Sequence, residues 1–83
     1  MCDSLAIARS RTADGQALFA KNSDRLPGEC QPFLQFPAAL HPMGASVRCS
    51  EISIPEVSET LRVMGHSPWW VWGFEHGINE RGV

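Results

Sequence analysis

Apolar and polar positions alternate at both ends of the first twenty residues, and this alternation predicts two short strands. Over residues 2–8, Leu5 and Ile7 alternate with small side chains, and a second apolar stretch, QALFA, covers residues 16–20. Asp14-Gly15 lies between them and is typical of a hairpin turn, because glycine accepts the positive φ of a tight turn at little steric cost. The pattern predicts a β-hairpin whose first strand begins at the start of the chain.

The middle of the chain alternates less regularly. Residues 21–29, KNSDRLPGE, are rich in turn-forming residues and are predicted to be a loop. Three further strands are predicted over Gln31–Phe36, Val47–Ile54 and Thr60–Met64. Residues 55–64 also carry apolar side chains at helical spacing, so a helix is the alternative there, although the β-branched Thr60 and Val63 favour a strand.

The last segment, SPWWVWGFEHGINERGV, is dense in tryptophan and glycine and stops just after a turn, at the start of a further strand. We therefore expect residues 1–83 to be a partial domain, truncated after Val83, with exposed sheet edges and an uncovered apolar face. The tryptophans at 69, 70 and 72 are expected to pack rather than to line a ligand pocket. His66 and His76 are expected on the surface or in turns, without a catalytic role.

Composition narrows the class of protein. The 83 residues suffice for one small domain with a thin core, and 43% hydrophobic with 19% charged residues is a globular composition. A formal charge of -2 gives no basic surface, so no nucleic-acid partner is expected. We also expect no membrane association, since no apolar run is long enough to span a bilayer and the first twenty residues carry four charges. The expected location is the cytoplasm.

The three cysteines, Cys2, Cys30 and Cys49, cannot all pair with one another and form no C-x-x-C unit. A zinc site that combines them with His41 and His66 would lack the short paired spacing of structural zinc. The sequence therefore predicts no disulfide framework, no metal and no cofactor.

Cys2 becomes the chain terminus if Met1 is removed, as is usual before a small residue. Its side chain could then attack a carbonyl carbon while its own α-amine, with an ordinary pKa of about 7.7–8.0, takes the proton. The simpler interpretation is a small residue at a frayed terminus. The segment AKNSDR favours the interpretation of Cys2 as a nucleophile, because a hairpin returns this segment to the cysteine's end of the sheet. There Asp24 could hold the terminal ammonium and Lys21 could favour the thiolate; the alternative is an ordinary turn with solvated charges.

Three stretches, MCDSLAIA, TADGQALFAKNSDR and PWWVWGFEHGINERGV, together resemble the secernin and cysteine dipeptidase family of N-terminal nucleophile hydrolases. The resemblance is strongest at residues 2–8, 12–25 and 68–83 and weak between residues 26 and 54. It implies an α+β fold, of which this chain would be the β-rich amino-terminal portion of a four-layer αββα sandwich, incomplete here because the relatives are much longer. One departure is Ala20, where the family usually has glycine.

The resemblance implies that Cys2 is the nucleophile and its α-amine the base, with Lys21 and Asp24 beside it. It also implies that Asn79 helps to bind the oxyanion, although N-E-R-G is equally good turn chemistry. The implied activity is hydrolysis of a dipeptide or other small amide through a Cys2 acyl-enzyme, with the 83-residue chain inactive alone. The alternative is a non-catalytic relative or truncated product that acts through protein association. The sequence leaves open the substrate's side chains, the removal of Met1 and whether the full-length protein is a homo-oligomer.

Overall fold

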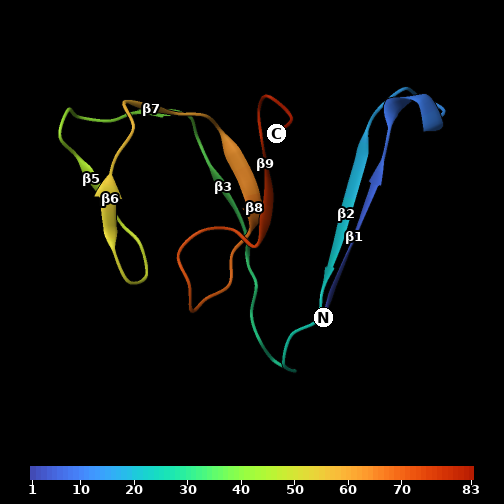
Figure 1. The fold of residues 1–83 in the computed structure, drawn as a ribbon, viewed down its shortest axis with the longest axis horizontal. Coiled ribbons are helices and arrows are strands. Elements are labelled where there is room, and N and C mark those ends of the chain that lie inside the picture. Colours follow the sequence, from blue (N-terminus) through green and yellow to red (C-terminus); the bar gives the residue numbers. More distant parts are fainter.

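The computed structural model describes residues 1–83 as a strand-rich chain with several small antiparallel sheets and almost no helix (Figure 1). The elements in chain order are β1 (Cys2–Ile7), the 3-10 helix η1 (Arg9–Arg11), β2 (Leu18–Ser23), β3 (Phe33–Phe36), β4 (Ala39–Leu40), β5 (Ser46–Arg48), β6 (Ser53–Pro55), β7 (Glu59–Thr60), β8 (Val63–His66) and β9 (His76–Asn79). They form the sheets β1-β2, β3-β8-β9, β4-β7 and β5-β6. The structure contains no helix with the length and apolar character needed to cross a membrane.

The predicted amino-terminal hairpin is confirmed. β1 and β2 pair antiparallel, with Leu5 opposite Ala20 and Cys2 opposite Ser23. At the turn, Gly15 has a φ of 70° and the Asp14 carboxylate accepts a hydrogen bond from the Gln16 amide at 3.1 Å. Figure 1 shows this hairpin standing apart from the other sheets, to which residues 24–32 connect it.

The end of β2 corrects the sequence prediction. The second strand is Leu18–Ser23 rather than residues 16–20, so the first three residues of the predicted loop, residues 21–23, belong to the strand. They pair because β1 begins at Cys2 and offers backbone partners as far as Ser23, which outweighs the turn preference of Asn and Ser. Ala20 has no positive φ, so the replacement of the family's glycine causes no backbone strain.

The central sheet holds β8 between β3 and β9, and two glycines allow its close packing. Gly65 lies opposite Gly77, and a Cβ on Gly65 would come within 2.5 Å of the His76 carbonyl oxygen and 3.0 Å of the Phe74 ring. The Phe74 ring therefore lies over this glycine pair. The backbone amide of the next residue, Glu75, donates to the His66 carbonyl at 2.8 Å, which fixes the chain where it enters β9.

The predicted Val47–Ile54 strand is wrong, since residues 46–55 form a small hairpin, β5 and β6, that reverses after Cys49. The turn was missed because C-S-E-I contains no glycine or proline. The helix alternative over residues 55–64 is also wrong, because the segment contains β7 and the start of β8. The β-branched Thr60 pairs with Ala39 and Val63 pairs with both Phe36 and Asn79.

These 83 residues bury little of their apolar surface. The accessible surface is 6885 Å² and no hydrophobic side chain is fully buried, whereas a compact protein of this mass exposes about 4,900 Å². The radius of gyration is 15.6 Å, against about 12 Å for a compact chain of this length. The predicted packing of the tryptophans is wrong for these residues, since Trp69, Trp70 and Trp72 are 74%, 53% and 57% exposed.

Candidate functional site

The amino terminus and the end of β2 lie side by side because of the hairpin register. Cys2 is opposite Ser23, and the Asp24 amide donates to the Met1 carbonyl at 3.1 Å. The Met1 ammonium lies 3.7 Å from Oδ2 of Asp24, while Oδ1 of the same carboxylate accepts a hydrogen bond from Asn22 at 2.9 Å. The structure therefore places the Asp24 carboxylate next to the terminal ammonium.

Lys21 projects from β2 toward the Cys2 end of the hairpin. Its ammonium donates to Oγ of Ser23 at 2.8 Å and to Oε1 of Glu75 at 2.9 Å. The hydrogen bond to Glu75 is the largest cause that raises the pKa of Lys21 above 10.5, and the nearby Cys2 sulfur adds to it. Lys21 is therefore a cation beside Cys2 at all physiological pH values.

Cys2, Lys21, Asp24 and Arg25 form a cluster with Glu75. The sequence pattern did not single out Glu75. Its Oε1 faces Cys2, whose Sγ lies 3.8 Å away, and Lys21; its Oε2 accepts from Arg25 at 2.8 Å and from Gln31 at 2.7 Å. The side chain is only 11% exposed. The available signal was its position in the motif W-G-F-E-H-G, as a lone carboxylate between two glycines.

The contacts explain why Glu75 stays ionised. The Arg25 guanidinium, followed by the Lys21 ammonium, lowers the pKa of the Glu75 carboxyl from 4.5 to about 2. The same contact raises the pKa of Arg25 above its ordinary value. The cations near Cys2 are thus paired: Lys21 and Arg25 both contact Glu75, and Arg25 also contacts Glu29, so that the charges of the cluster are largely compensated.

Arg25 also connects the cluster to an open cavity. Its guanidinium carbon lies 5.7 Å from the ring centroid of Trp70, and its Nε lies 3.7 Å from Glu29, which accepts a hydrogen bond from the Trp70 indole at 3.0 Å. Asp24 and these three side chains line a cavity of about 760 Å³ together with Trp69 and the loop at residues 26–28. The cavity adjoins the cluster through Asp24 and Arg25, which line it.

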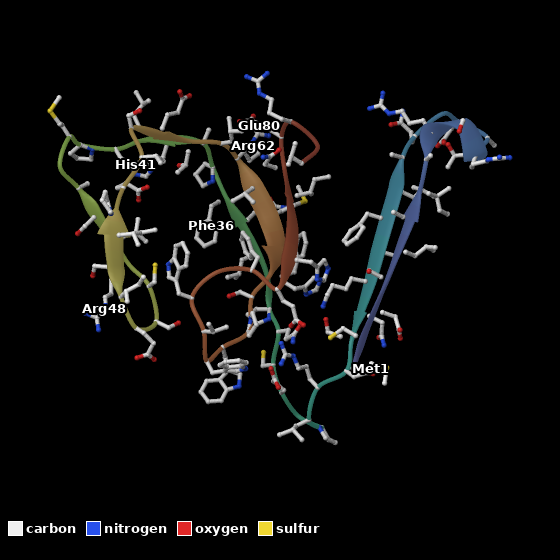
Figure 2. The ribbon with its side chains drawn as sticks, in the orientation of Figure 1. Met1, Phe36, His41, Arg48, Arg62 and Glu80 are labelled. Carbon is white, nitrogen blue, oxygen red and sulfur yellow. The ribbon has the colours of Figure 1, made fainter.

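Asn79 lies elsewhere. It ends β9, about 10 Å along the strand from His76, and Figure 2 shows the next residue, Glu80, at the upper edge of the central sheet, with Met1 near the lower edge of the view. The Oδ1 of Asn79 accepts hydrogen bonds from the amides of Arg81 at 2.9 Å and Val83 at 3.1 Å. The structure thus brings Cys2, Lys21 and Asp24 together and leaves Asn79 outside the cluster, as a turn residue.

A larger apolar groove lies between the central sheet and β5–β6. It encloses about 980 Å³, and its lining includes Phe36, Trp72 and Phe74. In this groove His41 contacts Oγ1 of Thr60 through Nε2 at 2.8 Å. Figure 2 shows Phe36 and His41 on this side of the central sheet, away from β1 and β2.

The remaining histidines and cysteines form no ligand set. His66 and His76 lie in β8 and β9 rather than in turns, with their rings stacked at 5.1 Å, which corrects the sequence expectation. All three cysteines are free thiols. No three His, Cys, Asp or Glu side chains are grouped so that they could hold a metal ion.

No protein-family model matches the sequence, and no solved structure matches the chain. The resemblance to the secernin and cysteine dipeptidase family therefore stays a prediction that depends on the quoted motifs.

Proposed function

We propose that this chain is the amino-terminal part of a cysteine amidohydrolase of the secernin-like dipeptidase type. The single observation that carries the proposal is the hairpin register, which places the terminal ammonium beside Asp24 and the Cys2 thiol beside the Lys21 cluster. An N-terminal nucleophile requires nucleophile and base on one residue, and removal of Met1 would give Cys2 both groups at this end of the hairpin.

In the proposed reaction Met1 is removed first. Hydrolysis of the Met1–Cys2 peptide bond frees the α-amine of Cys2, whose Cα lies about 3.8 Å from that of Met1. Cys2 pairs with Ser23, the residue before Asp24. The neutral amine accepts the thiol proton as Sγ bonds to the amide carbon of the substrate. The C–N bond breaks as the amine returns this proton to the leaving nitrogen, and water then hydrolyses the Cys2 acyl-enzyme.

The site's charges support this order of events. The Asp24 carboxylate lies 3.7 Å from the terminal ammonium of Met1, and the Lys21 ammonium is the cation that would stabilise a developing anion on the sulfur. The proposal includes the αββα fold, a cytosolic location in which the three thiols stay reduced, and a dipeptide or other small amide as substrate.

The test is capture of the acyl-enzyme in the full-length protein. Intact-mass spectrometry after mixing with an activated dipeptide ester should show loss of Met1 and one acyl adduct, which Cys2→Ala abolishes. Cys30→Ala is the matched control, because Cys30 is also exposed, and it should keep the adduct. An adduct that survives Cys2→Ala would overturn the proposal.

A second candidate is a non-catalytic protein that acts through association with another protein. The exposed tryptophans and the groove of about 980 Å³ are the observations that favour it. Association would then survive Cys2→Ala but would be weakened by Trp72→Ala, whereas the amidohydrolase proposal expects Trp72→Ala to leave the acyl adduct in place.

A further inference from the structure

We propose that Glu75 is a positioning residue of the Cys2 site, whose carboxylate holds the Lys21 ammonium beside the Cys2 sulfur. This inference rests on the proposed function, since it assigns Glu75 a role toward the nucleophile.

The two oxygens of Glu75 face different parts of the chain. Oε2 accepts from Arg25 Nη2 at 2.8 Å and from Gln31 Nε2 at 2.7 Å, both in the segment that follows β2. The Glu75 backbone amide donates to His66 in β8. The two bonds to Oε2 fix the carboxylate independently of Lys21, and the backbone bond fixes the main chain of Glu75, so that Oε1 is presented in a defined direction.

Oε1 is directed at the reactive end of the hairpin. It accepts from the Lys21 ammonium at 2.9 Å and lies 3.8 Å from Sγ of Cys2. Lysine has a long side chain with several rotatable bonds, and ordering it costs about 1.5–2 kcal/mol of conformational entropy. Its other hydrogen bond is to Ser23, two residues away on the same strand. The contact with Glu75 comes from another part of the chain and restricts Lys21 to the neighbourhood of the sulfur.

An ordinary structural ion pair between hairpin and sheet would explain the salt bridges alone. It would not explain why the same carboxylate oxygen contacts both Lys21 and the only thiol that can become terminal. Glu29 offers the internal comparison, because it also contacts Arg25 and is equally sheltered, at 12% exposed, but its other partner is Trp70.

The experiment is a double-mutant cycle in the full-length protein, with kcat and KM measured for Glu75→Gln, Lys21→Met and the double variant. If Glu75 acts through Lys21, Glu75→Gln lowers kcat by about 10-fold to 10²-fold with little change in KM. The double variant then falls within about 2-fold of Lys21→Met alone. Glu56→Gln, a control at a half-buried carboxylate that contacts His41 away from the cluster, stays near wild type. Losses that multiply in the double variant, or an unchanged kcat in Glu75→Gln, overturn the proposal.

A second measurement does not depend on activity or on complete stability of Glu75→Gln. In the full-length protein the ¹³Cε resonance of Lys21, assigned by its loss in Lys21→Met, can be titrated in wild type, Glu75→Gln and the shorter Glu75→Asp. We expect the Lys21 pKa to fall toward 10.5 in Glu75→Gln and by less in Glu75→Asp; no change in either variant overturns the proposal. The proposed function fails by a different result, namely activity that survives Cys2→Ala.

Discussion

The Lys21 ammonium lies 2.9 Å from Oε1 of Glu75, although 54 positions separate the two residues in the sequence. Lys21 belongs to β2, and Glu75 precedes β9 in the central sheet. With the neighbouring Arg25–Glu75 pair at 2.8 Å, this contact ties the amino-terminal hairpin to the rest of the chain. Because Cys2 pairs with the same strand as Lys21, the contact also determines which charges surround the thiol.

The first prediction concerns the acid titration of Glu75. Its carboxyl has a pKa of about 2 in the folded state and 4.5 ordinarily, so its contacts stabilise the fold fully above pH 4.5. This contribution is lost as the pH falls from about 4.5 through about 2. Arg25→Leu should raise the Glu75 pKa toward 4.5, measured by ¹³C carboxyl titration in the full-length protein, while the matched Arg48→Leu in β5 should not. A Glu75 pKa that stays at about 2 in Arg25→Leu would contradict this arrangement of charges.

The second prediction is that Asp24→Asn and Lys21→Met each lower turnover of the full-length enzyme by about 10²-fold or more, the usual worth of groups that assist proton transfer. Asp24→Asn removes the negative charge beside the terminal ammonium. Lys21→Met removes the positive charge beside the sulfur. Melting temperatures measured alongside should stay within a few degrees. Asp3→Asn, an exposed carboxylate on β1, is the control. Folded Asp24 and Lys21 variants with undiminished turnover would show that neither residue takes part in the reaction.

The third prediction is that the isolated 83-residue chain does not unfold cooperatively. No hydrophobic side chain is fully buried, while ordering costs roughly 1.5 kcal/mol per residue. Urea titration followed by circular dichroism and tryptophan fluorescence should give broad, non-coincident curves. A single sharp transition, independent of protein concentration, would mean that these sheets stabilise one another without a shared core.

The hairpin could be predicted from sequence because its determinants are local. Leu5 and Ile7 define a strand face, and Asp14-Gly15 forms the observed turn. The extension of β2 through Ser23 could not be predicted from the sequence, since it depends on backbone partners in β1 that outweigh the turn preference of the polar residues. This local pairing sets Cys2 opposite Ser23 and brings Asp24 into contact with Met1, at the end of the sheet to which the predicted hairpin returns the segment.

Glu75 illustrates what sequence patterns leave out. Nothing in W-G-F-E-H-G indicates which distant cations the carboxylate meets, because its contacts span 44 to 73 positions. For Asn79 the local motif does suggest roles, and it suggests two of them: an oxyanion ligand and a turn residue. In the structure its side chain caps the turn at residues 79–83.

If Cys2 acts through its own free α-amine, the activity of the protein depends on whether that amine is free or blocked. The full-length protein would be made with an aminopeptidase-resistant extension before Cys2, which carries a specific protease site so that cleavage regenerates the Cys2 terminus. Intact-mass spectrometry verifies each form before dipeptidase activity is measured.

With the extension in place the Cys2 nitrogen is an amide, which accepts no proton near neutrality. We predict that the extended form is about 10²- to 10⁴-fold less active than the cleaved form, roughly 3–5 kcal/mol of transition-state stabilisation. Equal activity of the extended and cleaved forms would rule out the α-amine as the base and leave Cys2 as a thiol activated only by its neighbours.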